Sequence, residues 1–161
     1  MLALLAMAPL LACALPGEED EEPVTFLLTT DLGTLPRVGL ELEAPMTSWG
    51  SAFVWFGYPI PGPSSGRDGG PQIAGGWRAF LFGRAPWGLF FDARLQIQSY
   101  FPLNPREPSP TIIPGAGLSL GLNAKLWRMV LSPGVGLFYV PDPVAASPVL
   151  PVLRLAFGIW N

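Results

Sequence analysis

The chain has 161 residues, a net charge of −3 and a sequence pI of about 4.8, and it contains no histidine. The length suits one domain, and the missing basic surface argues against nucleic acid as a partner. Without histidine, Ser/His/Asp, Cys/His and His–metal sites are excluded, which leaves carboxylate or Lys/Tyr chemistry. Charged residues make up 13% of the chain, about half the usual share of a soluble domain. Because the mean hydropathy is +0.39, part of the surface is expected to face an apolar solvent.

Residues 1–14 are predicted to be a signal peptide. The apolar run MLALLAMAPLLACAL is shorter than the roughly 20 residues of a spanning helix and suits the central region of an export signal. Two cleavage sites overlap in it. A lipobox-like LLAC favours cleavage at 12/13 and makes Cys13 a candidate lipid anchor, whereas ACA favours cleavage at 14/15; a buried N-terminal segment is the alternative. Residues 15–22, with five consecutive acidic residues, are predicted to be a solvated linker before a folded domain at 23–161.

Eight segments of that domain are predicted to be strands. They are 24–31, 37–44, 49–58, 72–82, 88–100, 111–127, 129–139 and 149–160. The clearest is GLFFDARLQIQSY at 88–100, where every second residue is apolar and Asp92, Arg94, Gln96 and Gln98 lie between them. Side chains alternate between the two faces of a strand, so this segment has one apolar and one polar face. Segment 49–58 is apolar on both faces, and its phase stays open.

The connections between these strands alternate in length. Short turns are predicted at 45–48, 83–87 and 127–128, and longer proline- or glycine-rich loops at 59–71, 101–110 and 140–148. Membrane-spanning β-barrels have short turns at one end and longer loops at the other. With eight strands, both termini would lie at the short-turn end.

The aromatic residues sort in the same way. Tyr58, Tyr100 and Tyr139 each close a predicted strand before a long loop, and they are expected to form an outer aromatic girdle. Four tryptophans lie beside short turns or at the C-terminus and are expected to form a girdle at the periplasmic side: Trp49, Trp87, Trp127 and Trp160.

One face of each strand carries the charges. The charged positions of the polar faces are Glu41, Glu43, Arg78, Asp92, Arg94, Lys125 and Arg154. If the polar faces point inward, these residues form an ion-pair cluster in the lumen, because an eight-stranded barrel is only wide enough for its own side chains. Counting back from the turn at 83–87 places Arg78 beside Asp92 and Arg94, and we predict that Arg78 pairs with Asp92. A proton site or small-ligand site is the alternative use of this cluster.

Residues 23–161 resemble the small bacterial outer-membrane β-barrels of the OmpA/OmpX-like class. The resemblance rests on APWGLFFDARL, GAGLSLGLNAKLWRMVLSPGVGLFY and VLRLAFGIW. It implies an all-β, eight-stranded, antiparallel up-and-down transmembrane β-barrel in the bacterial outer membrane, with the lipid bilayer and the outer-membrane assembly machinery as partners. We expect a monomer. In that class the last residues place an aromatic ring on the outward face, whereas Trp160 is out of phase with the outward series here.

The favoured function is that of a non-enzymatic outer-membrane barrel with a structural or envelope-integrity role. A lipocalin-like exported or lipid-anchored carrier with an apolar lumen is the alternative. The motif Gly115-x-Gly117-x-x-x-Gly121 has glycines at a period of two and is interpreted as a strand rather than a nucleotide loop. We find no set of catalytic residues and predict no enzyme activity, cofactor or metal.

Overall fold

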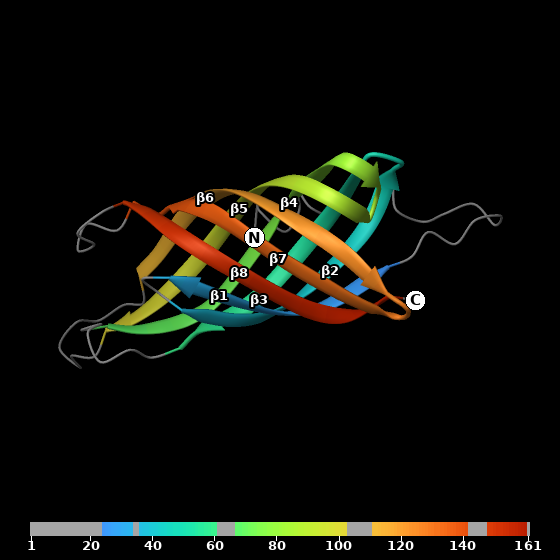
Figure 1. The fold of residues 1–161 in the computed structure, drawn as a ribbon. Helices are drawn as coiled ribbons and strands as arrows, with labels where there is room; N and C mark the ends of the chain where they lie inside the picture. The colour runs from blue at the N-terminus through green and yellow to red at the C-terminus, as the bar shows by residue number, and fades with distance from the viewer. Residues whose placement is uncertain (1–23, 34–35, 61–66, 103–110, 142–147, 161) are drawn as a thin grey trace.

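The computed structural model describes residues 24–33, 36–60, 67–102, 111–141 and 148–160, and it forms a closed antiparallel barrel with the strands in chain order (Figure 1). The strands are β1 (Thr25–Gly33), β2 (Arg37–Thr47), β3 (Gly50–Pro59), β4 (Arg67–Arg84), β5 (Trp87–Pro102), β6 (Thr111–Leu126), β7 (Met129–Tyr139) and β8 (Val149–Trp160). The predicted fold class, an all-β eight-stranded up-and-down barrel, is confirmed. The predicted signal peptide, the acidic linker and Cys13 lie outside the described residues.

Burial follows the period of two along the strands, with the polar face inside. In β5, Asp92, Arg94 and Gln96 are buried. Leu95, which lies between Arg94 and Gln96 in the sequence, points the other way and is 73% exposed. In β3, whose phase the sequence left open, Phe53 and Trp55 point inward and are 2% exposed. A slip of one residue would reverse both faces, so the inward charges and the outward apolar residues fix the register together.

The two ends of the barrel differ. β1 begins and β8 ends at the end where short turns join β2 to β3, β4 to β5 and β6 to β7 (Figure 1). The connections after β3, β5 and β7 are longer and lie at the opposite end. This alternation agrees with the connection lengths predicted from the sequence.

The β4–β5 hairpin is longer than predicted. The sequence predicts a loop over the whole of 59–71, but β4 begins at Arg67, which pairs with Pro102 of β5. Pro71 lies within a register shift of the β4–β5 ladder, and the β3–β4 ladder ends before it. A proline that has no ladder hydrogen bond to donate is tolerated at a bulge, which explains why the strand continues through this sequence.

Candidate functional site in the barrel lumen

A single arginine joins the three buried carboxylates in the middle of the lumen. The Arg78 guanidinium lies 3.1 Å from a carboxylate oxygen of Glu41 and 3.4 Å from one of Asp92, and it also forms an ion pair with Glu43. The side chains of all four residues are fully buried. Arg78 and Asp92 are direct partners in the β4–β5 ladder, whereas the two glutamates reach Arg78 from β2, which is not a neighbour of β4.

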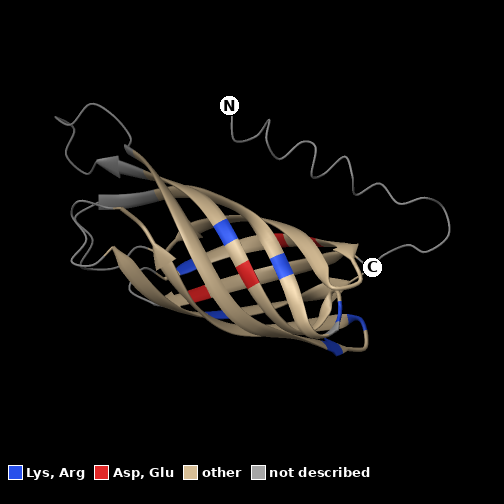
Figure 2. Ribbon diagram, turned by 90° about the horizontal axis from the view of Figure 1, so that it is seen from above, with Lys and Arg blue, Asp and Glu red and all other residues tan. Residues whose placement is uncertain are grey.

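Two further arginines complete the network. Arg154 of β8 lies 2.5 Å from Glu41 and 3.6 Å from Asp92, and Arg94 of β5 lies 3.3 Å from Asp92. Three carboxylates therefore face three guanidinium groups, and the network is neutral when all are ionised. Figure 2 shows these charges as a mixed band around the middle of the barrel. Mutual pairing of this kind is what a buried charge requires in place of water.

The arginines also stack against aromatic rings. The Arg78 guanidinium carbon lies 4.1 Å from the ring centre of Phe90 and 5.0 Å from that of Phe53. Rings and arginines alternate from the short-turn end to the opposite end in the order Phe90, Arg78, Phe53, Arg94, Phe138, Arg37 and Trp55, with separations between 4.1 and 5.8 Å. Each contact has the geometry of a cation–π interaction, which is strongest where water is excluded. We call these seven residues the arginine–aromatic column.

Glycines in β6 make room for this column. A Cβ atom on Gly117 would lie 2.6 Å from the Phe138 ring, and one on Gly121 would overlap the Phe90 ring. The period-two glycines that superficially suggest a nucleotide loop therefore have a packing role. Their strand interpretation agrees with the position of both residues in β6.

A second polar layer lies toward the long-loop end and was not singled out from the sequence. Asp31 and Arg37 are direct partners in the β1–β2 ladder, and their charged groups lie 3.5 Å apart. Arg37 also donates hydrogen bonds of 3.3 Å to Gln72 and 3.1 Å to Gln96. The equal spacing of Asp31 and Arg37 about the turn between their strands is the signal that could have identified this pair.

The predicted placement of Lys125 in the ion-pair cluster is wrong. Its side chain is exposed at the short-turn end, and its ammonium nitrogen lies 3.8 Å from the Trp160 ring centre and 5.4 Å from that of Trp87. Alternation gave the correct face, but Lys125 is only two residues from the β6–β7 turn and so lies beyond the buried section of the lumen.

The structure also corrects the predicted position of two tryptophans. Trp87 and Trp160 are half-buried rather than outward, and their ring centres lie 5.8 Å apart at 75°. Both pack against a buried apolar cluster that includes Leu27. Trp160 is on the inward phase of β8, so it packs over the inner lumen instead of facing lipid.

The other aromatic residues of the predicted girdles lie on the outside where they are described. Tyr58 and Tyr139 are exposed before the long loops, and Trp49 and Trp127 are exposed beside the short turns. The side chain of Tyr100 lies outside the described residues. That these rings mark the two boundaries of a bilayer stays a prediction.

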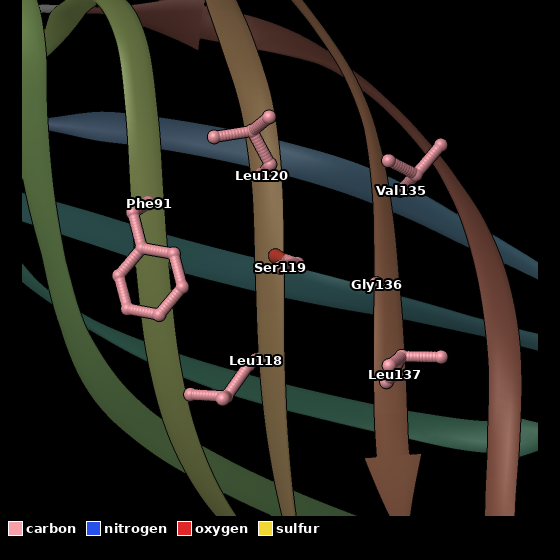
Figure 3. Close-up of a pocket in the computed structure, with 7 residues that line it drawn as sticks. All are labelled: Phe91, Leu118, Ser119, Leu120, Val135, Gly136 and Leu137. Carbon is pink, nitrogen blue, oxygen red and sulfur yellow. The ribbon is translucent and has the colours of Figure 1, made fainter.

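A shallow hollow of about 350 Å³ lies on the outer surface of β5, β6 and β7 (Figure 3). It is lined by Phe91, Leu118, Ser119, Leu120, Val135, Gly136 and Leu137. Side chains of leucine, valine and phenylalanine surround it on the outward face, and the small residues of the inward phase form its floor. It is an apolar depression in the wall, and the polar side chain in its lining, Ser119, is buried on the inward phase of β6.

The carboxylates in the centre of the lumen are engaged in ion pairs and hydrogen bonds. Each of the three central carboxylates contacts at least one arginine, and Glu43 also accepts hydrogen bonds from Ser51 and from Asn123, the latter at 3.2 Å. In the part of the chain that the structure describes, no group of three or more potential metal ligands occurs. Within the same residues, no helix has the length and apolar character to cross a membrane.

Comparison with solved structures shows which fold this is. The chain matches the N-terminal β-barrel domain of Pseudomonas aeruginosa OprF with a TM-score of 0.69 and 12% identity, over 89% of this chain and 100% of that domain. The barrel has the fold of eight-stranded outer-membrane proteins. It also matches Neisserial surface protein A (TM-score 0.54, 12% identity, 85% and 94% covered) and a de novo designed transmembrane β-barrel (0.51, 14%, 90% and 100%). No protein-family model and no curated protein sequence matches the chain.

Proposed function

We propose that this chain is a non-enzymatic β-barrel of the bacterial outer membrane, with a structural role in the envelope and a lumen plugged by its own ion pairs. The observation that carries the proposal is the neutral network of Arg78, Arg94 and Arg154 with the three central carboxylates. Because the three guanidinium groups and the three carboxylates pair with one another, the network is neutral and presents no net charge that would attract a permeating ion.

The outer surface supports the lipid bilayer as the surrounding medium. Leu40 is 63% exposed, and Phe82 and Leu95 are each 73% exposed, while Asp92 and Arg94 are buried. A lipocalin-like carrier needs the opposite arrangement, with an apolar lumen and a charged exterior. In a bilayer, moving a basic residue to the lipid face at the midplane costs about 2–4 kcal/mol. The shared fold with OprF and Neisserial surface protein A agrees with this medium.

Export and insertion by the outer-membrane assembly machinery and a monomeric state are expected of such a barrel. The absence of histidine and the engagement of Glu41 and Glu43 by Arg78 argue against catalysis. The loops then remain the part of the chain at which an external partner would bind.

Heat-modifiable gel mobility of the protein extracted from an outer-membrane fraction tests the location and the barrel. We expect an unboiled band that runs faster than the boiled one. Recovery in the soluble periplasmic fraction without a shift would contradict the proposal and favour the carrier.

Conductance across planar lipid bilayers tests the plug. We expect the purified, heat-modifiable protein to produce no stable current steps, because the arginine–aromatic column and its carboxylates occupy the centre of the lumen. Stable steps from the folded wild-type protein would show an open path for ions and would contradict a plugged lumen.

A further inference from the structure

The short-turn end of the barrel has an exposed basic rim, formed by Arg84 at the end of β4, Lys125 in β6 and Arg128 in the β6–β7 turn. Figure 2 shows blue segments in the turns at this end. Among the described residues, these turns contain no Asp or Glu, and the acids of β1, β2 and β5 are buried in the lumen. We call these three residues the basic rim.

The three residues lie on neighbouring hairpins and are linked by shared contacts. Arg84 is the ladder partner of Trp87, and the Lys125 ammonium lies 5.4 Å from the centre of the Trp87 ring. The Arg128 carbonyl accepts a hydrogen bond of 3.3 Å from the backbone N–H of Trp160, whose ring lies 3.8 Å from Lys125. The three residues of the basic rim therefore lie at the same end of the barrel, on the neighbouring β4–β5 and β6–β7 hairpins.

An aromatic ring beside this patch is held outward at a conformational cost. Trp127 has a φ of 58°, a left-handed conformation that disfavours residues with a Cβ atom, and its side chain is 82% exposed. Its carbonyl accepts a hydrogen bond of 2.7 Å from the Trp160 indole, which fixes the turn. Since the ring gains little packing within the barrel, the strained turn suggests a contact outside it.

We infer that the basic rim, with Trp127, binds the headgroups of anionic phospholipids such as phosphatidylglycerol. This inference rests on the proposed membrane location, where the short-turn end meets the water–lipid boundary. Tryptophan prefers that boundary, arginine pairs its planar donors with phosphate oxygens, and lysine supplies a point charge. The net positive charge of the rim complements an anionic headgroup and gives no comparable attraction to a neutral one.

The acidic residues 18–22 are the competing occupant, because they precede β1 and Thr25 of β1 is the ladder partner of Trp160. Phosphatidylglycerol is favoured because Trp127 points to an amphipathic surface. An acidic peptide would engage the charges but would leave the exposed indole unexplained.

Lipid binding to the full-length protein tests the inference. Native mass spectrometry from detergent would compare phosphatidylglycerol with phosphatidylcholine for three proteins: wild type, Arg84→Gln with Arg128→Gln, and Arg67→Gln with Arg106→Gln. The last pair removes the same charge from residues outside the basic rim. Heat-modifiable gel mobility shows whether each variant forms a folded barrel. A loss of lipid binding can therefore be told apart from a failure to form the barrel.

The wild type is expected to bind phosphatidylglycerol more tightly than phosphatidylcholine. Because a basic side chain near an anionic surface is worth about 1 kcal/mol, each rim substitution should reduce this preference about fivefold at low salt. The Arg67 and Arg106 substitutions should leave it unchanged. No preference in the wild type, or an equal loss in both double variants, would overturn the inference.

A variant with residues 18–22 changed to Gln or Asn separates the two occupants. If the wild type shows no preference and this variant gains one, the acidic segment covers the rim, and the lipid assignment is wrong for the native chain. If both proteins show the preference, the rim is available to lipid and the inference stands.

Discussion

The centre of the lumen and its short-turn end use similar residues in different ways. Arg78 lies between two phenylalanine rings and contacts three carboxylates, whereas Lys125 lies against two tryptophan rings, and no ion pair of it is found among the described residues. Arg78 is fully buried and Lys125 is exposed. Water solvates the lysine, so an aromatic contact is sufficient there, while the buried arginine requires acidic partners. Burial, more than residue type, decides which charges must be paired.

Removing the central cation should have the largest effect. Arg78→Ala would leave three buried carboxylates with two arginines, and breaking a buried pair costs about 3–5 kcal/mol. Urea unfolding of the protein refolded into phosphatidylcholine vesicles would measure the loss in the free energy of unfolding. Arg84→Ala is the matched control at an exposed position, where about 0.5 kcal/mol or less is expected. An unchanged stability for Arg78→Ala would refute the ion-pair plug.

A second substitution should recover part of that loss. Glu43→Gln in the Arg78→Ala background leaves two carboxylates and two arginines, so the network is neutral again. The double-mutant cycle should give a favourable coupling of about 0.5–3 kcal/mol in the same unfolding assay. Arg84→Gln is the control partner, since Arg84 is exposed, lies six positions along β4 from Arg78 and should combine additively with Arg78→Ala.

At the short-turn end, Trp127→Gly should increase the stability of the barrel. Glycine adopts a positive φ without the clash of a Cβ atom, so stability in phospholipid-free detergent should rise by about 1 kcal/mol. The thermal midpoint of the gel shift would measure it. Trp49→Gly is the comparison: Trp49 has no positive φ and its ring contacts Trp77 at 6.0 Å, so this variant should be less stable. Equal losses in both variants would argue against strain at Trp127.

The smallest effect is expected for Lys125→Gln. An exposed cation–π contact contributes about 0.5–1 kcal/mol, and the neighbouring tryptophan rings would still pack against each other. Urea unfolding in vesicles of phosphatidylcholine would measure this loss without a contribution from anionic lipid. A loss as large as that of Arg78→Ala would mean that Lys125 supports the central network and that the contrast between the two regions is invalid.

Much of the lumen could be predicted from local patterns. The alternation around Asp92 and Arg94 identified the polar face, and the turn after β4 was enough to place Arg78 opposite Asp92, as the ladder has it. Counting outward in the same way from the turn between β1 and β2 would have placed Asp31 opposite Arg37. The aromatic side of the column was harder to predict, because β3 is apolar on both faces and gave no phase for Phe53 and Trp55.

By itself, the sequence determined the number of strands, the end at which the short turns lie and the side of the wall on which most charges sit, since these depend on a period of two and on turn residues. The tertiary structure decided which of those charges meet. Glu41 and Glu43 reach Arg78 from a strand that is not its neighbour, and Arg154 reaches Glu41 across 113 positions of sequence. Barrel closure brings these side chains together and also leaves Lys125 at the exposed rim, because height along the barrel depends on the register of all eight strands.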